Sequence, residues 1–121
     1  MYKLAKRIVI EIAHFLPEHP GLCRNLHGHS IEVHIELSAV DLNENGMVAD
    51  FGDIKSIANK YDHQCLNDFP EFTSIPPTSE NLARFLAEDC MRRFPNIYCA
   101  EVSVRETEGS VATYVLPRNA E

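Results

Sequence analysis

Residues 27–40 read HGHSIEVHIELSAV. From Ile31 to Leu37 apolar and polar residues alternate, so every second side chain lies on the same side of an extended chain. This pattern predicts a β-strand with one face toward a core and the other toward water. The turn residues NENG at positions 43–46 follow, and they predict that the strand ends at about Val40.

The same alternation occurs on both sides of this segment. Residues 4–14, LAKRIVIEIAH, place four aliphatic side chains and His14 on one face. Toward the C-terminus, residues 100–106 and 111–116 give two further strands, separated by the turn residues EGS at 108–110. The sequence therefore predicts four β-strands.

Two helices are predicted between the second and third strands. Asp50 is placed to cap a helix that ends at about Tyr61, and Thr78 is placed to cap another, which Pro95 stops. The order ββααββ predicts a single α+β domain over residues 1–121, with both helices on the apolar face of a four-stranded antiparallel sheet. An open sheet leaves two edges exposed, which favours a homo-oligomer.

Composition narrows the function classes. The chain has 121 residues, 45% of them hydrophobic, and a net charge of −7, so binding to nucleic acid or to an anionic membrane is not expected. No apolar run approaches the ~20 residues of a membrane span, and the N-terminal residues lack the pattern of a signal peptide. We therefore expect a cytoplasmic protein. Its four cysteines lack CxxC spacing and are expected to be free thiols.

Three histidines are predicted to lie close together in the folded chain. His27 and His29 are two positions apart at the start of the second strand, so they share a face, and His14 ends the first strand on its apolar face. If the two strands pair as antiparallel neighbours, all three imidazoles converge at one end of the sheet. Three imidazoles with an open fourth position predict a catalytic zinc site. The alternative is that each histidine is an ordinary polar residue at a strand end.

The twelve-residue connection from Phe15 to Leu26 contains Cys23, four positions before His27. A connection of this length is longer than a hairpin turn needs, and long loops often carry function. A thiol beside a divalent cation ionises readily, which would make Cys23 a nucleophile or a base. Two alternatives remain open: Cys23 as a small buried side chain, or as a fourth ligand that closes a structural zinc site.

Two acidic residues, Asp62 and Glu106, lie where a carboxylate could take part in proton transfer or ligand binding. Asp62 is followed by His63, and a histidine oriented by a carboxylate is suited to proton transfer. Glu106 continues the apolar face of the third strand, where a carboxylate needs a cation or hydrogen-bond donors as partners. The guanidine-like donors of a pterin or purine ring would suit it.

Taken together, these residues resemble the 6-pyruvoyltetrahydropterin synthase family. The resemblance covers nearly the whole chain, from about Ile8 to Thr107, and rests on motifs in a fixed order: AH at 13–14, CRNLHGH at 23–29, MVADF at 47–51, DH at 62–63, PTSEN at 77–81 and VRET at 104–107. The CRNLHGH form looks most like the bacterial 6-carboxytetrahydropterin synthases of queuosine precursor synthesis.

This resemblance implies a tunnelling fold, assembled from trimers into a hexamer with active sites between subunits. By the family pattern zinc is held by His14, His27 and His29, a proton is abstracted by Cys23, protons are relayed by Asp62 and His63, and the pterin ring is contacted by Glu106 and Thr107. The implied substrate is 7,8-dihydroneopterin triphosphate, which loses triphosphate and, in the 6-carboxy branch, acetaldehyde. Zinc would act as a Lewis acid on the oxygens of the substrate side chain.

Three rival interpretations stay open at this level. The first is a 6-pyruvoyl synthase, which retains the substrate side chain. The second is a non-catalytic domain with a structural zinc on His14, Cys23, His27 and His29. The third is a catalytically silent pterin-binding module that uses Glu106.

Overall fold

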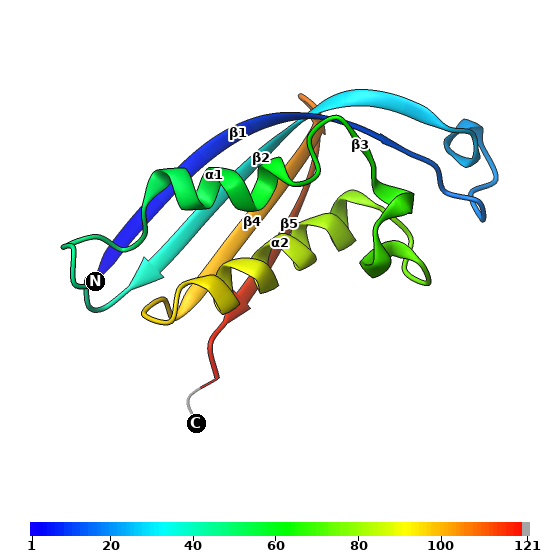
Figure 1. Cartoon of the computed structure of the whole chain (residues 1–121). Helices are drawn as coiled ribbons and strands as arrows, with labels where there is room; N and C mark the ends of the chain where they lie inside the picture. Colours follow the sequence, from blue (N-terminus) through cyan, green and yellow to red (C-terminus); the bar gives the residue numbers. More distant parts are fainter. Residues whose placement is uncertain (120–121) are drawn as a thin grey trace.

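The computed structural model describes residues 1–119 and consists of one curved sheet with two helices on one side (Figure 1). Residues 120–121, which the predicted domain includes, lie outside the described residues. The strands and helices, in chain order, are β1 (Tyr2–His14), β2 (His27–Ala39), α1 (Phe51–Asn59), β3 (Gln64–Cys65), α2 (Ser79–Arg93), β4 (Cys99–Thr107) and β5 (Ser110–Pro117). Single 3₁₀ turns cover Leu22–Arg24, Leu66–Asp68 and Pro70–Phe72.

The sheet has five strands in the order β3-β1-β2-β4-β5, so the prediction of four antiparallel strands was wrong by one strand. The four predicted strands are present and pair antiparallel. The fifth, β3, has two residues and lies parallel to β1, next to Ile12 and Ala13. Two residues are too few to show an alternating pattern, so the sequence gives no sign of this strand.

The core lies between the sheet and the helices. Ile10, Val33 and Val102 from three neighbouring strands are fully buried, as are Ile54 of α1 and Leu86 of α2. Figure 1 shows both helices across the same face of the sheet, as predicted. It also shows that the β1–β2 loop and the segment after β3 project beyond one end of the sheet, where the histidines were expected.

The predicted helix caps are confirmed. A carboxylate oxygen of Asp50 accepts from the Gly52 N–H at 2.7 Å, and the Thr78 hydroxyl oxygen accepts from the Asn81 N–H at 3.2 Å. Helix α1, however, ends at Asn59, before the predicted end at Tyr61. Tyr61 is fully buried as its apolar spacing suggested, but its N–H bonds to the carbonyl three residues earlier, so the chain is already in a tighter turn.

None of the helices within residues 1–119 is long and apolar enough to cross a membrane.

Candidate metal centre and adjoining pocket

The three predicted histidines come together at one end of the sheet. The antiparallel register of β1 and β2 places His14 opposite His27, and His29 opposite Ile12. One ring nitrogen from each histidine lies within 4.8 Å of the others, and His14 is 4% exposed. The predicted antiparallel pairing of the two strands is therefore confirmed, and the three imidazoles converge as predicted.

Backbone carbonyls orient two of the rings. Nδ1 of His14 lies 2.8 Å from the Pro77 carbonyl oxygen, and Nδ1 of His27 lies 2.9 Å from that of Asn25. A carbonyl oxygen only accepts hydrogen bonds, so Nδ1 carries the proton in both rings and Nε2 keeps its lone pair. Nε2 of His14 lies 3.1 Å from Nε2 of His29, which directs the His14 lone pair into the cluster.

Burial lowers the pKa of His14, and the neighbouring His27 and His29 lower it further, against an opposing effect of the hydrogen bond to Pro77. The neutral form, which is the one that binds metal ions, is therefore favoured at His14. Three converging imidazoles, two of them held by carbonyls through the other ring nitrogen, fit a divalent metal such as zinc.

A pocket of about 390 Å³ adjoins the cluster. Its walls come from the β1–β2 loop, the first residues of α2 and the β4–β5 hairpin, and it is lined by His14, Leu16, Cys23, His27, Thr78–Glu80, Glu106 and Gly109–Ala112. The loop is closed by a hydrogen bond of 2.7 Å from the Leu16 N–H to the Cys23 carbonyl. This pocket thus brings together the predicted ligands His14 and His27, the predicted base Cys23 and the predicted ring contact Glu106.

Cys23 lines this pocket as a free, partly exposed thiol in the 3₁₀ turn Leu22–Arg24. It is not a buried packing residue. In the described chain its sulfur is not part of the group of ligand atoms within 4.8 Å of one another. The geometry therefore favours a thiol beside a three-histidine site over a closed four-ligand site.

Glu106 lies at the end of β4, on the same face as the buried Val102 and Val104, as predicted. One of its carboxylate oxygens accepts from the Ser79 hydroxyl at 2.6 Å. A carboxylate has acceptor capacity beyond this single bond, so Glu106 can also accept from a ligand. Its neighbour Thr107 is exposed and is not among the residues that line the pocket.

The Asp62–His63 pair lies elsewhere, beside the edge of β1. An oxygen of Asp62 accepts from the Glu11 N–H at 2.8 Å and lies 3.1 Å from Nδ1 of His63. The first of these bonds, and then His63, hold the pKa of Asp62 below its usual value. The His63 side chain is 76% exposed, its backbone is left-handed with φ of 59°, and neither residue lines the Cys23 pocket.

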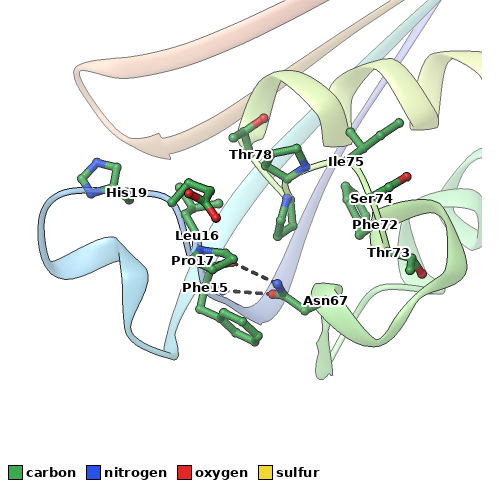
Figure 2. A pocket seen from close by; sticks show the side chains of 13 residues that line it. Phe15, Leu16, Pro17, His19, Asn67, Phe72, Thr73, Ser74, Ile75 and Thr78 are labelled. Carbon is green, nitrogen blue, oxygen red and sulfur yellow. Dashed lines mark hydrogen bonds between the residues drawn. The ribbon is translucent and has the colours of Figure 1, made fainter.

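A second pocket, of about 530 Å³, was not predicted from the sequence (Figure 2). One wall is the start of the β1–β2 loop, from Phe15 to His19, and the other is the segment 72–78 with Asn67. It shares Leu16 and Thr78 with the first pocket.

The sequence profile described as 6-pyruvoyl tetrahydropterin synthase matches residues 3–117. The chain belongs to this family. The resemblance inferred from the motifs is thereby confirmed. Relatives named as tetrahydropterin synthases align with most of the chain.

One relative, from Synechocystis sp. (strain ATCC 27184 / PCC 6803 / Kazusa), is named 6-carboxy-5,6,7,8-tetrahydropterin synthase. The two sequences are 36% identical, and the alignment covers 98% of this chain and 96% of the relative. A relative of the same name from Bacillus subtilis (strain 168) is 32% identical, covering 93% and 84%. The solved structure of Caenorhabditis elegans 6-pyruvoyl tetrahydropterin synthase superposes with a TM-score of 0.74 at 26% identity, covering 93% and 94%. The fold of this chain is that of the tetrahydropterin synthases.

Proposed function

We propose that this chain is a zinc-dependent lyase that converts 7,8-dihydroneopterin triphosphate to 6-carboxy-5,6,7,8-tetrahydropterin, with release of triphosphate and acetaldehyde. Its place would be in cytoplasmic 7-deazaguanine and queuosine biosynthesis. Support comes from the family membership, from the two relatives named 6-carboxytetrahydropterin synthase, and from the pocket that joins Cys23 and Glu106 to the histidine cluster.

The observation that carries the proposal is the 3.1 Å separation of Nε2 of His14 and Nε2 of His29. The His14 nitrogen is a lone-pair donor because its ring proton is on Nδ1, bonded to Pro77. His14, His27 and His29 would hold the zinc ion and leave a ligand position open toward the pocket. When bound, zinc supplies Lewis acidity to the oxygens of the substrate side chain.

Cys23 is the proposed base. As a partly exposed free thiol on the pocket wall, it is accessible to a bound substrate. The thiolate takes a proton from a carbon of the substrate side chain. Its position in a loop closed on Leu16 keeps it on the side of the pocket that His27 also lines.

Glu106 is the proposed anchor for the pterin ring. Its carboxylate would accept hydrogen bonds from the guanidine-like N–H groups, while the Ser79 hydroxyl holds one of its oxygens in place. Thr107 is the proposed additional ring contact, and because it is exposed it would meet the ring only at the rim of the site.

Asp62 and His63 are proposed to relay protons in the site of a neighbouring subunit. Within one chain they do not line the Cys23 pocket, and the His63 ring is largely exposed at the edge of β1. The lowered pKa of Asp62 keeps it ionised, so it can orient the His63 imidazole. A left-handed backbone at a residue other than glycine is costly, which suits a position kept for function. The proposed assembly is a homohexamer, a dimer of trimers.

Mass spectrometry of the products tests the proposed reaction. Zinc-loaded protein incubated with 7,8-dihydroneopterin triphosphate should yield 6-carboxytetrahydropterin, acetaldehyde and triphosphate. A product that retains the side chain would instead indicate the 6-pyruvoyl activity, the activity named for the Caenorhabditis elegans structure. No turnover by folded, zinc-loaded protein would contradict both and favour a structural zinc or a pterin-binding module.

A further inference from the structure

The side-chain amide of Asn67 makes two hydrogen bonds to the backbone of Phe15, the residue that follows His14. The Phe15 N–H donates to Oδ1 of Asn67 at 3.0 Å, and Nδ2 of Asn67 donates to the Phe15 carbonyl at 3.0 Å (Figure 2). A primary amide offers a C=O acceptor and an N–H donor side by side, as the N–H and C=O of a single residue do along one edge of a strand. Asn67 therefore binds Phe15 as a strand residue would.

This pair continues the ladder between β1 and β3. The two strands pair in parallel at Ile12 with Gln64 and at Ala13 with Cys65, an offset of 52 positions that Phe15 and Asn67 share. The backbone leaves the strand at Leu66, where a 3₁₀ turn begins. The Asn67 side chain thus supplies the hydrogen bonds that the departing backbone no longer provides.

The two bonds fix the chain on the far side of His14. On the near side, Ala13 is held by Cys65 of β3 and by Gly28 of β2. With both neighbours of His14 held, its backbone dihedrals are set, and its ring reaches the Pro77 carbonyl through Nδ1. The same bonds fix the first residue of the loop that carries Cys23.

We propose that Asn67 is a positioning residue for the metal centre: it fixes the backbone at Phe15, immediately after His14, so that Nε2 of His14 faces His29. The proposal rests on the function proposed above, because it takes the three-histidine cluster to be a zinc site. Asn67 acts through the Phe15 backbone on the neighbouring His14, whose Nδ1 bonds to the Pro77 carbonyl, and it is not one of the proposed metal ligands or substrate contacts.

Asn96 provides a matched control. Its side-chain amide also bonds backbone carbonyls, those of Val48 at 3.1 Å and Asp41 at 3.4 Å. It lies after α2, near the end of the sheet opposite to the histidines. A merely structural loss of amide-to-backbone bonds should therefore look the same in both variants.

The first test measures zinc affinity by competition with a chelator and the visible spectrum of cobalt-substituted protein. Asn67→Ala should bind zinc about tenfold more weakly and give an altered cobalt spectrum. Asn96→Ala should lower Tm and leave both unchanged. If Asn67→Ala lowers Tm but keeps the wild-type zinc affinity and cobalt spectrum, the proposal is overturned.

The second test needs no metal. Nitrogen NMR of the histidine rings at about pH 8.5, where free imidazoles are neutral, should show His14 protonated on Nδ1 in the wild type and a tautomer mixture in Asn67→Ala. If the wild-type protein binds no zinc, the proposed function fails, and the role of Asn67 is then judged from the His14 tautomer ratio alone. A ratio that is the same in the wild type and in Asn67→Ala overturns the positioning role. If Asn67→Ala does not fold, the isosteric Asn67→Asp replaces the donor with a carboxylate oxygen. Because the added charge itself changes metal binding, the tautomer ratio of the metal-free Asn67→Asp variant then decides in the same way.

Discussion

Nε2 of His14 and Nε2 of His29 lie 3.1 Å apart, although the two residues belong to different strands. The register of β1 and β2 brings them together, and the Pro77 carbonyl turns the His14 lone pair toward its neighbour. Two ring nitrogens at this distance either share a proton, which a neutral His29 can carry on Nε2, or bind a common cation. Because burial lowers the pKa of His14, its ring is favoured in the neutral form, which is the form that can bind a metal ion.

Removing one imidazole should abolish metal binding. His29→Ala should reduce zinc from about one ion per chain to a small fraction after dialysis, measured by elemental mass spectrometry. The fold should persist, because His29 is only partly buried. His34→Ala is the control, since His34 is exposed on the polar face of β2 and should leave the zinc content unchanged. Stoichiometric zinc in His29→Ala would contradict the three-histidine site.

Removing the Cys23 thiol should separate catalysis from metal binding. Cys23→Ala should retain zinc and lose at least about 100-fold in kcat, because the proposed base is gone. Cys99→Ala, which removes another partly buried free thiol outside the pocket, should retain both. A loss of most zinc affinity in Cys23→Ala would instead support a structural site with Cys23 as fourth ligand.

The carboxylate of Asp62 should make stability depend on pH in the acid range. Its pKa is lower in the folded chain, through the Glu11 N–H and then His63, than the value of about 3.9 expected when unfolded. The stabilisation is therefore present above about pH 4 and is lost as the pH falls through the folded pKa. The Tm of the wild type should exceed that of Asp62→Asn at about pH 6, and the gap should shrink toward about pH 3. A gap that does not change with pH would refute this.

Arg118 should stabilise the end of α2 without affecting the site. Its guanidinium donates to the carbonyls of Ile97 at 2.8 Å, Met91 at 3.0 Å and Phe94 at 3.1 Å. Arg118→Ala should lower the free energy of unfolding by about 1 to 2 kcal/mol, measured by urea denaturation. Zinc affinity should not change, because the histidines lie at the other end of the sheet. Arg118→Lys should recover only part of the loss, since an ammonium cannot reach the three carbonyls as a planar fork does.

Much of the fold follows from the sequence because burial is one-sided. The helices cover one face of the sheet, so β1 and β2 alternate clearly, and that alternation also places the three histidines on one face. Asp50 and Thr78 begin the helices because their side chains accept from backbone N–H groups of the first turn.

The supports of the site are harder to predict. The hydrogen-bond partner of the His14 ring is the backbone carbonyl of Pro77. Every residue has this group, so the residue type at position 77 does not predict the bond. Asn67 acts because β3 ends two residues earlier, and β3 is itself too short to be predicted. The proposed role of Asp62 and His63 depends on a second copy of the chain, and the strand and helix patterns of the sequence carry no sign of where that copy packs.

Thirteen consecutive residue pairs, from Tyr2 with Ala39 to His14 with His27, join β1 to β2. A slip of one position along this ladder would turn His27 and His29 away from His14 and would expose the aliphatic side chains of β2 as well. The imidazole cluster and the core thus depend on a single alignment. A chain that has paired β1 and β2 incorrectly therefore cannot assemble the cluster, so metal uptake would report the correct alignment of these two strands.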